Sequence, residues 1–168
     1  VAMHVIDADF ELVSEVPVSA LFGFVGTYVL WDGQAQVKPS YIGEGNILKR
    51  IVDHSRDYAT PLNGYIAILG EAARAGAKRD AEILETVLLV AAAETRRSPP
   101  NNSQAGSLRG IASLFRRHGV IRVNLTGYNP LSPPRLRRVF DERKEIRLSE
   151  DESGNIFMSH PWKSRHGG

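Results

Sequence analysis

Apolar and polar positions alternate along two short stretches of the N-terminal half, and this alternation predicts two strands. The first stretch, residues 26–31, is rich in β-branched and aromatic side chains, and the second begins at Tyr41. Between them, Asp32-Gly33 is a strong turn signal. We therefore expect an antiparallel hairpin with a loop longer than the minimum.

The same alternation predicts which side chains share a face of this hairpin. Successive side chains of a strand point to opposite faces. Tyr28 and Val29 therefore point to opposite faces, and so do Tyr41 and Ile42. If Val29 and Ile42 face the core, both tyrosines lie side by side on the other face. The loop length leaves the register of the two strands open.

Apolar residues at helical spacing predict three further segments, and an apolar run predicts a third strand. Asn46 is a suitable N-cap for a helix over residues 47–55. The third strand spans residues 65–69, and the next helices span 78–94 and 107–118. This order places helices on both sides of a small sheet.

Beyond residue 118 the pattern predicts a strand over 120–125 and a helix that opens at Ser132-Pro133-Pro134. A hairpin is expected from residues 146–149 and 156–159. We therefore predict an α/β (α+β) fold in which a three-stranded, mainly antiparallel sheet is flanked by helices. The expected units are residues 1–105, a core with an N-terminal lead-in, and residues 106–168, a basic helical and hairpin extension packed on or appended to it.

Composition adds an uneven charge distribution to this picture. The chain has 168 residues, and residues 1–100 carry 9 Lys/Arg against 13 Asp/Glu, whereas residues 101–168 carry 12 against 6. Such asymmetry indicates that the C-terminal part approaches a polyanion, and the alternative is a solvated arginine-rich surface. The chain has no cysteine, no apolar stretch near 20 residues and no secretory signal in its first ten residues. We expect a cytoplasmic protein without a membrane partner.

Candidate catalytic side chains follow the two tyrosines along the chain. Arg50 and His54 are four residues apart on one predicted helix, so they share a face, and Glu82 and Glu85 lie near the polar edge of a later helix. Taken singly, each is an ordinary packing or surface residue. Together, the phenols, guanidinium, imidazole and carboxylate suit a one-metal site that cleaves a phosphodiester.

In this order of elements the chain resembles the GIY-YIG nuclease family. The two tripeptides of that family correspond to Gly26-Thr27-Tyr28 and Tyr41-Ile42-Gly43, and the arginine and histidine of its next helix to Arg50 and His54. The family glutamate lies just ahead of a paired aliphatic step, here Leu88-Leu89, which points to Glu85, with Glu82 as its competitor. A closing Pro-x-x-Asn corresponds to Pro99–Asn102, where Asn101 competes with Asn102. The resemblance covers about residues 24–102, and Thr27 and Glu44 depart from the usual pattern.

The resemblance implies a role for each matched residue. Glu85 would hold a single Mg²⁺, for which Mn²⁺ can substitute, and Arg50 would bind a phosphate oxygen. Tyr28 would act as general base, with Tyr41 and His54 orienting water or relaying a proton, and Asn102 would complete the catalytic set. Arginines of the extension would contact nucleic-acid phosphates: Arg109, Arg116, Arg117, Arg135 and Arg138.

The expected function is therefore Mg²⁺-dependent endonuclease activity on DNA. Because one such site cuts one strand, cleavage of both strands would require a homodimer or two sequential events. Two alternatives remain open: a nucleic-acid-binding module that keeps the fold without cleavage, and an RNA-cleaving, toxin-type nuclease.

Overall fold

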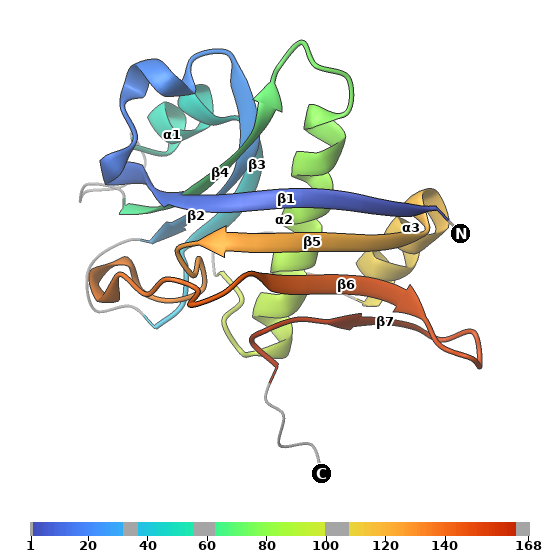
Figure 1. Ribbon diagram of the computed structural model, residues 1–168. Coiled ribbons are helices and arrows are strands. Elements are labelled where there is room, and N and C mark those ends of the chain that lie inside the picture. Colours follow the sequence, from blue (N-terminus) through green and yellow to red (C-terminus); the bar gives the residue numbers. More distant parts are fainter. Residues whose placement is uncertain (1, 32–36, 56–62, 100–107, 164–168) are drawn as a thin grey trace.

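Seven strands form one continuous mixed sheet in the computed structural model, which describes residues 2–31, 37–55, 63–99 and 108–163 (Figure 1). The strand order is β3-β2-β4-β1-β5-β6-β7. Only the β1–β5 pair of this sheet is parallel; the other neighbours are antiparallel within the described residues. The strands are β1 (Met3–Leu12), β2 (Phe24–Trp31), β3 (Tyr41–Asn46), β4 (Asn63–Glu71), β5 (Val120–Gly127), β6 (Lys144–Glu150) and β7 (Ile156–Ser159).

The expected three-stranded antiparallel sheet is therefore wrong, although a mixed α/β architecture remains. Strands β3, β2 and β4 form only one end of the larger sheet, and the remaining four strands come from the supposed lead-in and extension. Strand β1 alternates cleanly, with Ile6 and Ala8 buried and Asp7 and Asp9 exposed. That period of two is typical of a strand with one covered face.

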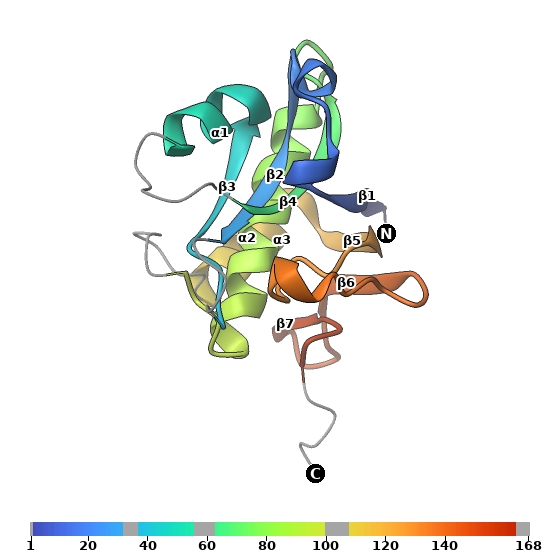
Figure 2. The ribbon, with the colours of Figure 1, turned by 90° about the vertical axis from the view of Figure 1, so that its left-hand side faces the viewer.

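Helices cover the two faces of the sheet unequally. Helices α2 (Ala77–Glu94) and α3 (Leu108–His118) pack on one face, and α1 (Ile47–Ser55) packs on the opposite face over β2 and β3 (Figure 2). Three short 3₁₀ helices complete the described elements: η1 (Val13–Glu15), η2 (Val18–Leu21) and η3 (Pro134–Leu136). The β3–β2–β4 end of the sheet thus lies between α1 and α2.

Two apolar layers hold these elements together. The larger lies under α2 and α3 and includes Val29 and Ile42, and it extends to Met158 near the C-terminus. The smaller lies under α1 and includes Tyr28 and Ile47. Successive residues of β2 therefore pack in different layers: Tyr28 in the smaller one and Val29 in the larger one.

Several predicted elements are confirmed with small changes of boundary. The helix over 47–55 is α1, and the backbone N–H of Lys49 donates to Asn46 Oδ1 at 3.1 Å, as expected for an N-cap. The helices expected over 78–94 and 107–118 correspond to α2 and α3, and β5 and the β6–β7 hairpin are also present.

The helix expected after Ser132 is wrong. Only Pro134–Leu136 forms a single 3₁₀ turn, and Arg137 ends it in the left-handed region with φ 47°. A residue with positive φ cannot continue a right-handed helix, so the following arginines lie on an extended segment.

The sheet runs without a break across the boundary expected near residue 105, because β1 pairs with β4 on one side and with β5 on the other. The two-unit division stays a prediction. In the described part of the chain, no helix combines the length and apolar character needed to cross a membrane.

Candidate active site

The two tyrosines of the central hairpin stack on one face of the sheet. Val29 is opposite Ile42 in the β2–β3 register, and both side chains are fully buried beneath α2. Tyr28 and Tyr41 therefore lie on the α1 face, where their ring centroids are 6.0 Å apart and their planes 18° apart. The predicted arrangement of these side chains is confirmed.

Gly43 makes room for this stack. A Cβ atom at position 43 would lie 2.5 Å from the Tyr28 hydroxyl and 2.5 Å from a ring carbon of Tyr41. Such distances are shorter than any normal contact, so only glycine lets the Tyr28 ring cross β3. Since β3 is the end strand of the sheet, the Tyr28 hydroxyl lies at the sheet's outer edge.

Arg50 approaches this edge from α1. Its Nε atom lies 3.4 Å from the point that a Cβ at Gly45 would occupy, so its side chain lies over the end of β3. The guanidinium is exposed, and its charge lowers the pKa values of both Tyr28 and Glu85. The charge of Arg50 therefore acts on both Tyr28 and Glu85, the two residues that were predicted to share its site.

Glu85 comes from the opposite face of the sheet. It lies on α2 and is half-buried, and burial, followed by the charges of Glu44 and Glu82, raises its pKa from 4.5 to about 7. The charge of Glu85 in turn raises the pKa of Tyr28. Tyr28 and Glu85 thus come from different faces of the sheet, but the charge of Glu85 still acts on the Tyr28 phenol.

Burial has the largest effect on Tyr28 and raises its pKa well above the ordinary value. Tyr41, Glu85 and Glu44 raise it further, and Arg50 opposes them. The phenol is therefore protonated at neutral pH in the free protein. Loss of that proton requires additional positive charge nearby.

Glu44 and Lys78 also belong to this site. Lys78 Nζ lies 3.6 Å from Glu44 Oε1 and 3.8 Å from Glu82 Oε1. The second carboxylate oxygen of Glu44 is buried and has no hydrogen-bond partner. Lys78 was not among the residues predicted from sequence. Its spacing could have indicated it, because Lys78, Glu82 and Glu85 are four and three residues apart and so share one face of a helix.

The residues present fit a single bound Mg²⁺. Oxygen atoms such as those of carboxylates are the ligands that Mg²⁺ prefers. The pKa of Glu85 is raised first by burial and then by the charges of Glu44 and Glu82, and a bound cation would offset these effects. Glu82 is more exposed, with 52% of its side chain accessible, and the contribution to Tyr28 comes from Glu85. Among the described residues no group of three or more potential metal ligands is present; Glu85 is the carboxylate that would hold the ion.

Other predicted residues fall outside this geometry. The His54 side chain, Asn101, Asn102 and the Arg109 side chain lie outside the described residues. The remaining predicted phosphate contacts are exposed: Arg116 and Arg117 at the end of α3, and Arg135 and Arg138 in and after η3. Helix α3 precedes β5 and η3 follows it, so the two pairs of arginines lie toward opposite ends of that strand and form two separate groups (Figure 1).

Comparisons with known proteins leave the site to be judged on its geometry. No family model, no curated protein and no solved structure gives a significant match to this chain.

Proposed function

We propose that the chain is a Mg²⁺-dependent endonuclease that hydrolyses DNA phosphodiester bonds at a single-metal site of the GIY-YIG type. The observation that supports this most directly is that Arg50 and Glu85 both act on the Tyr28 phenol: the charge of Arg50 lowers its pKa and that of Glu85 raises it. Each comes from a different element, and each changes or experiences the charge of the others. A chance surface cluster would not need a buried phenol and a half-buried carboxylate at the same place.

In this proposal each side chain has a separate task. Arg50 binds a non-bridging phosphate oxygen with its planar guanidinium. Tyr28 and Tyr41 position the attacking water. Tyr28 first releases its own proton to bulk water, which the charge of Arg50 favours, and its phenolate then accepts the proton of the attacking water. Bound at Glu85, Mg²⁺ would neutralise charge on the phosphate and on the leaving oxygen.

Plasmid nicking tests the proposal. Supercoiled plasmid is incubated with the protein in Mg²⁺, Mn²⁺ or EDTA, and relaxed product is measured over time. We expect cleavage with either metal, none with EDTA, and at least about a hundredfold lower rates in Glu85→Gln and Tyr28→Phe. Glu150→Gln, which changes an exposed carboxylate on β6, is the matched control and should cleave normally.

Equal cleavage by wild type and Glu85→Gln, or undiminished cleavage in EDTA, would contradict the proposal. Single-stranded DNA and RNA of the same sequence are assayed in parallel. A preference for RNA would favour the RNA-cleaving alternative over the DNA enzyme.

One observation favours a second candidate, a nucleic-acid-binding module without cleavage. Glu44 follows Gly43 on β3 and its charge raises the pKa of Tyr28, so it would repel an approaching phosphate, and Lys78 already contacts its carboxylate. A binding module needs no ionised Tyr28, which agrees with its raised pKa. DNA binding without nicking under every metal condition would support this alternative.

A further inference from the structure

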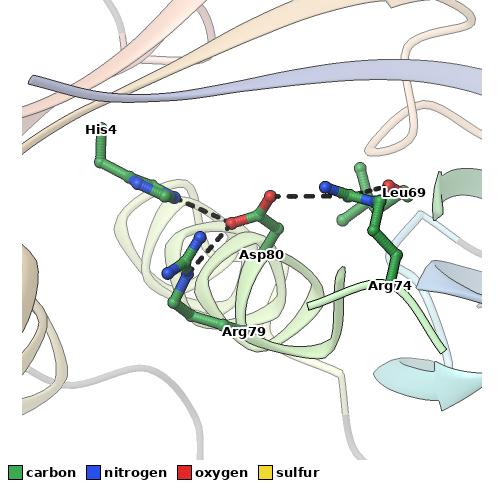
Figure 3. A network of polar contacts seen from close by, with 5 residues as sticks. All are labelled: His4, Leu69, Arg74, Arg79 and Asp80. Atoms are coloured by element: carbon green, nitrogen blue, oxygen red, sulfur yellow. Dashed lines mark hydrogen bonds and ion pairs between the residues drawn. The ribbon is translucent and has the colours of Figure 1, made fainter. Parts of the chain in front are cut away.

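A second group of charged side chains surrounds Asp80 at the start of α2. His4 Nε2 lies 2.8 Å from Asp80 Oδ1, Arg79 Nε lies 3.5 Å from the same oxygen, and Arg74 Nη2 lies 4.0 Å from Asp80 Oδ2. Figure 3 shows these three side chains directed toward the one carboxylate from β1, from α2 and from the segment before α2. We call His4, Arg74, Arg79 and Asp80 the Asp80 cluster.

The two arginines of the Asp80 cluster are held in place yet remain accessible. Arg74 Nη2 donates a hydrogen bond to the carbonyl oxygen of Leu69 at 2.6 Å. Both arginine side chains are 51% exposed, whereas that of Asp80 is 14% exposed. The carboxylate is thus covered, and the guanidinium groups face solvent.

Gly70 and Gly76 leave room for the guanidinium groups of Arg74 and Arg79. A Cβ at Gly70 would lie 2.5 Å from Arg74 Nε, and one at Gly76 would lie 2.8 Å from Arg79 Nη2. Each guanidinium therefore packs against backbone that carries no side chain. This limits the conformational freedom that either arginine would lose on binding a ligand.

Positive charge exceeds negative charge at this place. Arg74 and Arg79 share one carboxylate, and both lie at the start of a helix, where the helix dipole disfavours cations. His118 at the end of α3 lies against His4, with ring centroids 6.0 Å apart. Burial has the largest effect and lowers the pKa of His118; the charges of Arg117, His4 and Arg79 lower it further, and Asp80 opposes them.

We propose that Arg74 and Arg79, held by Asp80, bind a backbone phosphate of the nucleic acid at a site separate from the candidate active site. This inference rests on the proposed function and adds the surface that would position the substrate. Fixed guanidinium groups match phosphate oxygens in geometry and charge. Arg79 and Glu85 are about 9 Å apart along the α2 axis, roughly the length of two to three nucleotides of one strand.

Binding of a fluorescein-labelled 20-base-pair DNA duplex in EDTA tests this site without cleavage. Fluorescence anisotropy gives the Kd over a range of salt concentrations for wild type and for Arg74→Gln/Arg79→Gln. We expect the double variant to bind about tenfold more weakly, with the slope of log Kd against log salt reduced by about 1–2. Arg96→Gln, at an exposed arginine beyond the other end of α2, is the control and should change neither the affinity nor the slope by a comparable amount.

A second measurement uses the unaltered protein and so does not depend on whether the variant folds. Nuclear magnetic resonance titration of the His118 imidazole, free and with the duplex, should show a raised pKa in the complex, because a nearby phosphate favours the charged form. An unchanged pKa, or wild-type affinity and slope in the double variant, would overturn this inference alone. Absence of duplex binding by the wild type in EDTA would also overturn this inference, whereas the proposed function is decided by plasmid nicking in Mg²⁺.

Discussion

At the scale of the residue, Glu85 links the chemistry of the site to stability. Burial, followed by the charges of Glu44 and Glu82, raises the pKa of its carboxyl from the ordinary value of 4.5 to about 7 in the folded protein. The native state therefore binds this proton more tightly than the unfolded chain does. The resulting stabilisation is complete below pH 4.5 and is lost as the pH rises through about 7.

Replacing Glu85 by glutamine should therefore stabilise the protein at high pH and not at low pH. At pH 8.5 in EDTA the variant loses a buried negative charge, and we expect its free energy of unfolding to increase by on the order of 1–3 kcal/mol. At pH 4 the two proteins should differ little. Urea unfolding at both pH values measures this, with Glu150→Gln as control, and an equal difference at the two pH values would argue against the raised pKa.

Gly43 supports a second prediction at this scale. Gly43→Ala should destabilise the protein by about 1–3 kcal/mol, since the added methyl group would overlap the Tyr28 hydroxyl and the Tyr41 ring. Near-ultraviolet circular dichroism would report the displaced rings, and urea unfolding the loss of stability. Gly110→Ala in α3 is the matched control, because a Cβ there meets only Thr86 Cγ2 at 3.3 Å. Native spectra and stability in Gly43→Ala would contradict this role.

Alternation along a strand was enough to predict the stacked tyrosines, because it depends on local backbone geometry alone. The Asp80 cluster was not predictable in this way. His4 and Asp80 are 76 residues apart in sequence, and no local pattern links a strand near the N-terminus to the start of α2. The likeness of Glu85 to a metal ligand was suggested by sequence, but its raised pKa depends on burial and on Glu44 in another element.

At the scale of the element, the N-cap of α1 controls the position of Arg50. The Asn46 side chain, four residues and so about one turn before Arg50, accepts the N–H of Lys49. Asn46→Ala should cost about 1 kcal/mol of stability and weaken the first turn of the helix. If Arg50 acts as proposed, plasmid nicking should fall more in Asn46→Ala than in Asn46→Ser, which keeps a capping oxygen. Equal nicking and stability in the two variants would exclude a role for the cap.

Helical spacing located α1, α2 and α3 well, because an amphipathic stripe over several turns is a strong local signal. Strand β1 was missed although it alternates: only an N-terminal lead-in that packs on the core was expected there. The helix predicted after Ser132 was wrong because the local signal for a helix start was present but the helix does not continue. Prolines suit a first helical turn, but the left-handed conformation at Arg137 ends the turn at once.

At the scale of the whole molecule, the sheet joins the two halves of the sequence. Strand β1 is flanked by β4 and β5, so the early strand is hydrogen-bonded to segments from both halves. The larger apolar layer likewise contains Val29 from β2 and Met158 from β7. Parallel pairing between strands so distant in sequence depends on the entire fold, which explains why sequence patterns could not reveal it.

Because the layer is shared, the chain should unfold as one cooperative unit. Its two tryptophans report on both parts: Trp31 is buried in β2 and donates to the Pro130 carbonyl, and Trp162, after β7, donates to Asn129 Oδ1. In Trp31→Phe and Trp162→Phe, each with one tryptophan left, the urea midpoint from fluorescence should equal that from far-ultraviolet circular dichroism. The two variants differ in stability, so the comparison is made within each variant. A fluorescence midpoint displaced from the dichroism midpoint in either variant would show that the residues near that tryptophan unfold separately.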